Sequence, residues 1–309
     1  MALTVRAIVC AVDFSAFSPS VVGHGVALAR RTGWPLYLFH AVHNPQDGVH
    51  PTAVFERGGE LHHHQTDARR RMHDLMIDVP VKWEAVIRVG DPVEQTLAFV
   101  RDLPPCLVIS ASHGVSGLRR LFIGTVVERL TRALEHPMLV VKSAERGGDV
   151  RRSGFRSAVV SCDGHGHWRR MMPLLALLQR DAASRIHLVH AMEGPLEATQ
   201  ADLETASYTE VQQVLQERLA QQYRRQVRAF FPEDHRLSVV VAPGVPEEMV
   251  MSVAQQEASE LIVVGVRRSG RMGRLISGST TEALLRHAPC CVLAFPEPEK
   301  TPSTPGASR

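Results

Sequence analysis

The sequence lacks the features that mark membrane, secreted and disulfide-rich proteins. No apolar run approaches the roughly 18 residues that cross a membrane as a helix. The start of the chain has neither a basic region ahead of an apolar stretch nor a small-residue cleavage site. Only five of the 309 residues are cysteines, without C-x-x-C spacing and mostly inside apolar runs, which is typical of buried reduced thiols. We therefore expect a cytoplasmic protein without a membrane partner.

An excess of charge of one sign is also missing. The chain carries 35 lysines and arginines against 32 aspartates and glutamates, a net charge of +3, which argues against nucleic acid as the main partner. The G-x-S-x-G, GxxxxGK(S/T) and H-E-x-x-H motifs of common enzyme classes do not occur. The sequence therefore predicts no catalytic residue.

Short β-branched runs alternate with longer helical patterns along the whole chain. This alternation predicts parallel sheets covered by helices on both faces. The expected strands of the first half are residues 5–12, 35–42, 81–88, 106–110 and 138–142, and those of the second half are 157–162, 185–191, 236–242, 261–265 and 290–295. The first helix should begin with Ser18 as its N-cap and end before Gly33, and its counterpart in the second half should begin at Trp168.

The two halves are copies of one unit. Residues of the first half recur 150 or 154 residues later, as in the pairs Asp13 and Asp163, His40 and His190, Gly124 and Gly278, and Thr125 and Ser279. A period this long excludes a solenoid and indicates two domains. We expect them at residues 1–145 and 154–298, joined by a polar linker at 143–153. A polar tail begins at Glu297 and should be disordered, with 299–309 outside the second domain.

A glycine-containing loop follows the fourth strand of each half. The two loops span residues 111–125 and 265–279, and a helical pattern follows each of them. Glycine lets backbone N–H groups approach an anion closely, and a helix N-terminus adds free donors and the positive end of the helix dipole. Both loops therefore favour phosphate as a ligand.

These loops resemble the signature of the universal stress protein family, Gly-x2-Gly-x9-Gly-(Ser/Thr) after the fourth strand. The matching positions are Ala111, Gly114, Gly124 and Thr125 in the first half, and Gly265, Arg268, Gly278 and Ser279 in the second. Each copy lacks a different glycine. The resemblance covers nearly the whole chain and implies an α/β fold of two tandem Rossmann-like domains of the adenine nucleotide alpha hydrolase-like type. Each would be a five-stranded parallel sheet of order 3-2-1-4-5 with helices on both faces.

The resemblance also implies a bound adenine nucleotide, ATP or AMP, with Mg²⁺ only alongside ATP. It would lie at the carboxyl ends of the first and fourth strands, where the strand order reverses. The implied contact residues of the first half are Val12, Asp13, Ala41, Ala111, His113, Gly114, Gly124, Thr125 and Val126. Those of the second half are Asp163, Ala191, Gly265, Arg268, Gly278, Ser279 and Thr280.

Three of these positions leave alternatives open. Asp13 either faces the nucleotide or caps a turn. Ala111 adds a methyl group, which is tolerated at a negative φ and interferes at a positive one. Arg268 either fills the second phosphate site or donates hydrogen bonds to a phosphate there.

Two histidine-containing stretches suggest other chemistry at first sight. The stretch GHGH at residues 164–167 looks like the H-x-G-H of nucleotidylyltransferases, but its histidines are two residues apart rather than three. The three consecutive histidines at residues 62–64 would lie on a helix, where neighbouring side chains point about 100° apart and cannot converge on one ion. The sequence therefore predicts no metal site.

The function predicted is that of a stress-response or regulatory protein that binds an adenine nucleotide mainly in its first half. Two alternatives stay open, a ligand-free scaffold with both sites degenerate and a slow nucleotide hydrolase with weak ATPase activity at most. The resemblance implies that the fifth strands of the two halves pair as an intramolecular pseudo-dimer, and a homodimer of the whole chain is a further alternative. The residues expected near that seam are Leu139, Val141, Val292 and Phe295.

Overall fold

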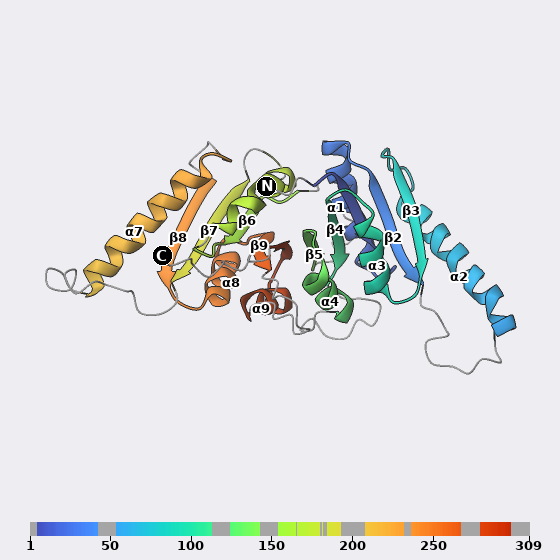
Figure 1. The fold of residues 1–309 in the computed structure, drawn as a ribbon. Coiled ribbons are helices and arrows are strands. Elements are labelled where there is room, and N and C mark those ends of the chain that lie inside the picture. Colours follow the sequence, from blue (N-terminus) through green and yellow to red (C-terminus); the bar gives the residue numbers. More distant parts are fainter. Residues whose placement is uncertain are drawn as a thin grey trace, which may run out of the picture.

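A computed structural model gives the fold (Figure 1). It describes residues 5–42, 54–112, 124–142, 154–164, 166–179, 181, 184–192, 208–231, 236–266 and 279–297. The predicted linker at 143–153 and tail at 299–309 lie outside these residues. None of the helices in the described ranges is long and apolar enough to cross a membrane. All five cysteines lie in the described ranges as thiols; four are buried and Cys290 is partly buried.

The strands form one ten-stranded sheet with the order β3-β2-β1-β4-β5-β10-β9-β6-β7-β8. The strands of the first half are β1 (Ala7–Ala11), β2 (Leu36–Val42), β3 (Trp83–Val89), β4 (Cys106–Ala111) and β5 (Met138–Val141). Those of the second half are β6 (Ser157–Ser161), β7 (Arg185–Met192), β8 (Leu237–Pro243), β9 (Leu261–Val266) and β10 (Cys291–Pro296). All neighbours within a half pair in parallel, which confirms the predicted order 3-2-1-4-5 twice over.

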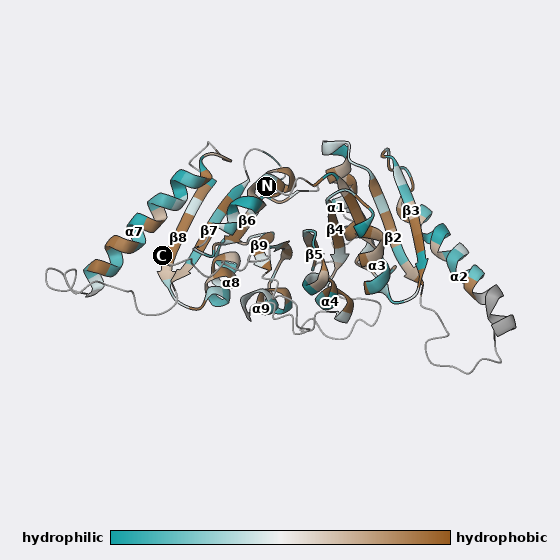
Figure 2. Ribbon diagram, in the orientation of Figure 1, coloured by the Kyte–Doolittle hydropathy of each residue, from teal (hydrophilic) through white to brown (hydrophobic). Residues whose placement is uncertain are grey.

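Helices cover both faces of the sheet, because alternate strand residues point to opposite sides. In β1, Ile8 and Cys10 enter one buried cluster, whereas Ala7 and Val9 enter the other. The first cluster is closed by α1 (Ser18–Thr32), α2 (Val54–Leu75), α5 (Met172–Leu178) and α7 (Tyr208–Val227). The second is closed by α3 (Pro92–Arg101), α4 (Thr125–Ala133), α8 (Pro246–Gln256) and α9 (Ser279–His287). The outer helices α2 and α7 carry many hydrophilic residues, as expected at the two ends of the sheet (Figure 2).

The first helix differs from the prediction at its start and agrees at its end. Its N-cap is Phe17, whose side chain has no acceptor to cap the helix, and the Ser18 hydroxyl donates a hydrogen bond to Asp13 Oδ1 at 3.3 Å instead. Gly33 adopts a left-handed φ of 70° just past the helix and donates its N–H to the Ala29 carbonyl. The predicted N-cap is therefore wrong, and the predicted glycine stop is confirmed.

The helix expected from Trp168 begins instead as a 3-10 turn, η3 (His167–Met171). Proline at residue 173 has no N–H and cannot donate to the Arg169 carbonyl one α-turn earlier. That carbonyl accepts from the Met172 N–H, three residues on, and α5 starts only there. Proline near the start of α5 thus explains why the α-helix begins at Met172 rather than, as predicted, at Trp168.

The fifth strands of the two halves pair, which confirms the predicted seam. β5 and β10 run antiparallel, with Leu139 opposite Leu293 and Val140 opposite Val292. All four side chains are fully buried. Val141 and Phe295, also predicted near the seam, flank the paired stretch and are buried as well. Both buried clusters continue from one half into the other across this pairing.

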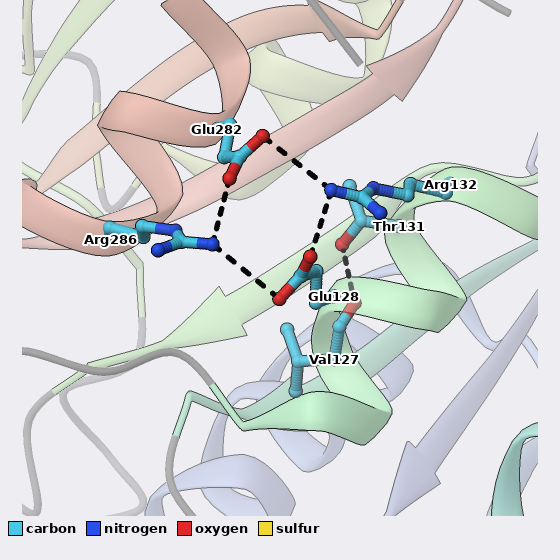
Figure 3. Close-up of polar contacts among 6 residues, drawn as sticks. All are labelled: Val127, Glu128, Thr131, Arg132, Glu282 and Arg286. Carbon is cyan, nitrogen blue, oxygen red and sulfur yellow. Dashed lines mark hydrogen bonds and ion pairs between the residues drawn. The ribbon is translucent and has the colours of Figure 1, made fainter. Parts of the chain in front are cut away.

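A ring of four ion-pairing side chains crosses the seam between α4 and α9 (Figure 3). Arg132 lies 2.8 Å from Glu128 and 3.5 Å from Glu282, and Arg286 lies 2.7 Å from Glu282 and 3.8 Å from Glu128. Glu282 and Arg286 occur 154 residues after Glu128 and Arg132, so the ring repeats the symmetry of the two halves. Because the side chains are about one-third exposed, we assign the ring a role in orientation rather than a large stabilisation.

Lys142 also ties the halves together. Its Nζ donates to the carbonyls of Leu284 at 3.4 Å and Ala288 at 3.2 Å, at the end of α9. Burial lowers the pKa of Lys142 from 10.5 to about 8, because the charged form is poorly solvated there. The free energy of unfolding should therefore carry a pH dependence that originates in this one side chain.

We predict that wild-type protein gains stability relative to Lys142→Met as the pH rises from about 8 to 10.5. In this window the unfolded chain binds a proton at Lys142 that the folded chain has released, so folding is penalised less at the higher pH. Urea unfolding of both proteins across this window measures the difference, in which the cysteines common to both cancel. A difference that stays constant with pH would contradict the assignment.

Candidate functional site

Each half has a topological switch point at the carboxyl ends of its parallel strands, and we call these two places the first and the second crevice. Ala11 at the end of β1 pairs with Ser110 near the end of β4, so the residues that follow the two strands are neighbours. β6 and β9 pair in the same way in the second half. These are the points at which the strand order reverses, where open α/β sheets bind their ligands.

Asp13 follows β1 and serves a turn with one of its two oxygens. Oδ1 accepts hydrogen bonds from the Ser15 N–H at 3.0 Å and from the Ser18 hydroxyl. Oδ2 accepts none from the described residues. The turn-capping role is therefore present, and it leaves one carboxylate oxygen for a ligand.

Two aromatic side chains, Phe14 and His40, lie beside Asp13. Phe14 has a positive φ of 60°, and its ring lies 4.6 Å from the His40 ring, centroid to centroid. The Arg71 guanidinium covers the Phe14 ring at 4.3 Å and donates to the Phe14 carbonyl. His40 donates through Nδ1 to the Val12 carbonyl at 2.8 Å, which orients the ring beside the partly buried Ala41, and burial lowers the pKa of His40.

Sequence reasoning missed the roles of Phe14 and Arg71. Arg71 comes from α2, 57 residues from Phe14, and nothing in its local pattern distinguishes it from the neighbouring arginines. His40 had a signal, because it recurs as His190, whose Nδ1 donates to the Cys162 carbonyl at 3.0 Å. The repeat therefore preserves a histidine that holds the residue just before each crevice aspartate.

The opposite wall of the first crevice is the end of β4 and the start of α4. The Gly124 N–H donates to the Ser112 carbonyl at 2.8 Å, which brings the helix start back to the strand end. Gly124 is the N-cap and α4 has no side-chain cap, so with respect to the described residues the first N–H groups of the helix, including those of Thr125 and Val126, are available as donors. The Thr125 side chain is exposed.

Ala111 lies at the end of β4 and is not among the described residues with positive φ. The methyl group that replaces a glycine of the family signature therefore causes no backbone strain. His113 and Gly114, also predicted to contact the ligand, lie outside the described residues.

The second crevice repeats the framework of the first. Asp163 follows β6, Ala191 lies near the end of β7, and Gly265 lies in β9. The Thr281 hydroxyl donates to the Gly265 carbonyl at 2.9 Å and ties α9 to the strand, and Thr280 donates to Glu247 at 3.0 Å. Arg268 and Gly278 lie outside the described residues; so does the side chain of Ser279, whose backbone begins α9.

The second crevice differs from the first in the side chains that fill it. The ring nitrogen Nδ1 of His167 lies 2.7 Å from Asp163 Oδ2 and 3.4 Å from Glu297 Oε2. The Glu297 side chain is only 10% exposed and lies over Gly265, where an added Cβ would be 2.5 Å from Oε1. The prediction that the polar tail is disordered from Glu297 on is wrong at this residue, because β10 carries the chain into contact with η3.

Comparisons with known proteins lead to one family. A sequence model of the universal stress protein family matches residues 4–142 and 162–296. The universal stress protein MJ0577 of Methanocaldococcus jannaschii is 31% identical over 94 residues, which are 29% of this chain and 58% of that protein. A universal stress protein of Thermus aquaticus is 28% identical over 141 residues, which are 45% of this chain and 97% of that protein.

Solved structures with a similar fold extend over nearly the whole chain. A universal stress protein from Archaeoglobus fulgidus has a TM-score of 0.64 at 15% identity, covering 94% of this chain and 98% of its own. The protein PA1789 from Pseudomonas aeruginosa, described as functionally unknown, has a TM-score of 0.63 at 16% identity, covering 95% and 93%. At these identities the likeness shows the fold alone.

Proposed function

Because the chain belongs to the universal stress protein family, we propose that this stress-response protein binds an adenine nucleotide, ATP or AMP, in the crevice of its first half. The observation that carries the proposal is the start of α4, which has no side-chain cap and is held against the end of β4 by the Gly124–Ser112 hydrogen bond. Free N–H groups at the positive end of a helix dipole are suited to phosphate.

Each wall of this crevice has a distinct part in the proposal. The phosphates lie against Gly124, Thr125 and Val126, with His113 and Gly114 in the connecting loop. The free Oδ2 of Asp13 accepts a hydrogen bond from the ribose or the adenine, and the backbone at Val12 and Ala41 lines the adenine. Mg²⁺ accompanies ATP and is not required for AMP.

The proposal assigns the nucleotide to the first half because carboxylates fill the second crevice. The Glu297 carboxylate lies over Gly265, the residue that corresponds to Ala111, and Asp163 lies close by. Two carboxylates at this point repel a phosphate. A ligand-free scaffold is the alternative for the chain as a whole.

We predict that the full chain binds ATP or AMP more tightly than GTP. The reason is that adenine has a donor at its exocyclic amino group where guanine has an acceptor, so a backbone carbonyl at Ala41 that accepts from adenine cannot accept from guanine at that position. Isothermal titration calorimetry with the three nucleotides measures the preference. Equal affinities for ATP and GTP would contradict an adenine-specific crevice.

Mass spectrometry of small molecules released from the purified protein separates a nucleotide-binding protein from a scaffold. The proposal predicts an adenine nucleotide in the released fraction or, after its removal, rebinding of added ATP. A chain that releases no nucleotide and binds none when it is added would be the scaffold.

A further inference from the structure

Three side chains with metal-binding groups meet in the crevice of the second half. Asp163 follows β6, His167 begins η3 and Glu297 follows β10, so three separate elements supply them. One possible ligand atom from each lies within 4.8 Å of the other two. Their side chains are 16%, 29% and 10% exposed, respectively, so the cluster is largely withdrawn from water while His167 keeps some access.

The two carboxylates face the same ring nitrogen. Asp163 Oδ2 and Glu297 Oε2 both lie within 3.4 Å of His167 Nδ1. Because ionised carboxylates only accept hydrogen bonds, this arrangement requires positive charge or a donated proton between them. A cation bound by all three groups meets the same requirement and adds direct bonds to each.

The Asp163 carboxylate is not fully hydrogen-bonded among the described residues. Its second oxygen, Oδ1, is buried and has no hydrogen-bond partner among the described residues. A buried carboxylate oxygen without a partner destabilises the fold, because it loses its hydrogen bonds to water and forms none within the protein. Asp13 also has one oxygen without a partner among the described residues, but that oxygen is not a buried unpartnered atom, so the costly burial belongs to the second half.

The cluster is absent from the repeat-equivalent positions of the first half. Phe17 corresponds to His167 and Ser143 corresponds to Glu297. Gly265 corresponds to Ala111, and only the glycine leaves room for the Glu297 carboxylate. Three substitutions between the copies thus combine to assemble one cluster, which a merely degenerate nucleotide site would not require.

We propose that Asp163, His167 and Glu297 bind a divalent transition-metal ion, with Zn²⁺ or Co²⁺ preferred over Mg²⁺ and Ca²⁺. Imidazole with carboxylate oxygen is a ligand set suited to these ions, whereas Mg²⁺ and Ca²⁺ prefer oxygen ligands alone. Three protein ligands leave a further position for water or for a ligand from solution. The proposal is independent of nucleotide binding in the first half.

The test uses the full chain after treatment with a chelator and dialysis, without nucleotide. Co²⁺ is titrated by its visible absorption and Zn²⁺ by calorimetry, with Mg²⁺ for comparison. We expect one tightly bound Co²⁺ or Zn²⁺ per chain and weaker binding of Mg²⁺. His167→Phe, which installs the residue of the first half, should weaken Zn²⁺ binding at least about 10- to 100-fold, since even loss of a group that only supports a ligand has that effect.

Two further variants make the result specific. Gly265→Ala should also weaken Zn²⁺ binding, because its methyl group displaces the Glu297 carboxylate, while the folded circular dichroism spectrum is kept. Joint replacement of the exposed histidines at residues 62–64 by alanine should leave the tight site intact. The proposal is overturned if wild-type protein binds no ion stoichiometrically, if folded His167→Phe or Gly265→Ala binds Zn²⁺ as tightly as wild type, or if the histidine replacement removes the ion.

Discussion

Replacing Leu139 by alanine should lower the free energy of unfolding of the whole chain by about 2–5 kcal/mol. Leu139 is fully buried in β5 and lies opposite Leu293 of β10, in the buried cluster that both halves share. Loss of the side chain removes apolar burial and leaves a cavity at the seam, where β5 is held by β4 on one side and by β10 on the other, which limits collapse. Urea unfolding followed by circular dichroism measures the change.

The pairing of β5 with β10 also predicts how two such changes combine. Leu293→Ala should cost a similar amount, and the double variant should depart from the sum by about 0.5–3 kcal/mol because the two side chains share one contact region. Ile77→Ala is the control, since Ile77 is 64% exposed and its loss should change stability by no more than about 0.5 kcal/mol. Strictly additive costs with two separate unfolding transitions would mean that the halves do not share a core.

Replacing Thr125 by glutamate should weaken ATP binding about 10- to 100-fold. The residue is exposed in the first turn of α4, where the proposed phosphates lie. A unit charge about 4 Å from a phosphate oxygen costs up to about 4 kcal/mol near a protein surface, and solvent reduces this toward the expected range. The same carboxylate favours the helix itself by about 0.3–1 kcal/mol, because it lies at the positive end of the dipole.

Binding and stability should therefore change in opposite directions in Thr125→Glu, which separates loss of the ligand from loss of the fold. Thr125→Gln has the same size without the charge and should keep most of the affinity. Ser279→Glu is the matched change 154 residues later and should leave ATP binding nearly unaltered. Calorimetric titration of the three variants with ATP measures these affinities. Wild-type ATP affinity in Thr125→Glu would contradict the proposal that the phosphates lie at the start of α4.

The strands could be predicted because each depends on local information, and their order was implied by the resemblance of the loops to the family signature. Apolar runs of β-branched residues define the strands, and Gly33 ends α1 in the left-handed conformation that only glycine adopts freely. The recurrence of residues at a fixed spacing showed two copies of one unit, and the family resemblance implied that the fifth strands at the sheet edges pair. None of these steps needed knowledge of contacts between distant side chains.

The cluster of Asp163, His167 and Glu297 could not be predicted, because it depends on contacts between side chains that are distant in the sequence. His167 lies in the GHGH stretch, which was rejected for the spacing of its histidines, but the residue acts with partners from other segments. Glu297 lies 130 residues further on, in a stretch that reads as an unstructured tail until β10 carries it over Gly265. Arg71 over Phe14 is a similar case in the first crevice. Charged side chains that converge only through the fold leave no periodic signal in the sequence.

The number of ATP molecules bound per chain tests the central claim most directly. The claim is that one crevice binds a nucleotide and that carboxylates exclude it from the other. Titration of nucleotide-free full-length chain, treated with a chelator and dialysed so that the second crevice holds no transition metal, with ATP and Mg²⁺ should give one site per chain in the wild type and a strongly weakened site in Thr125→Glu. Two sites of comparable affinity per wild-type chain, or none, would contradict it.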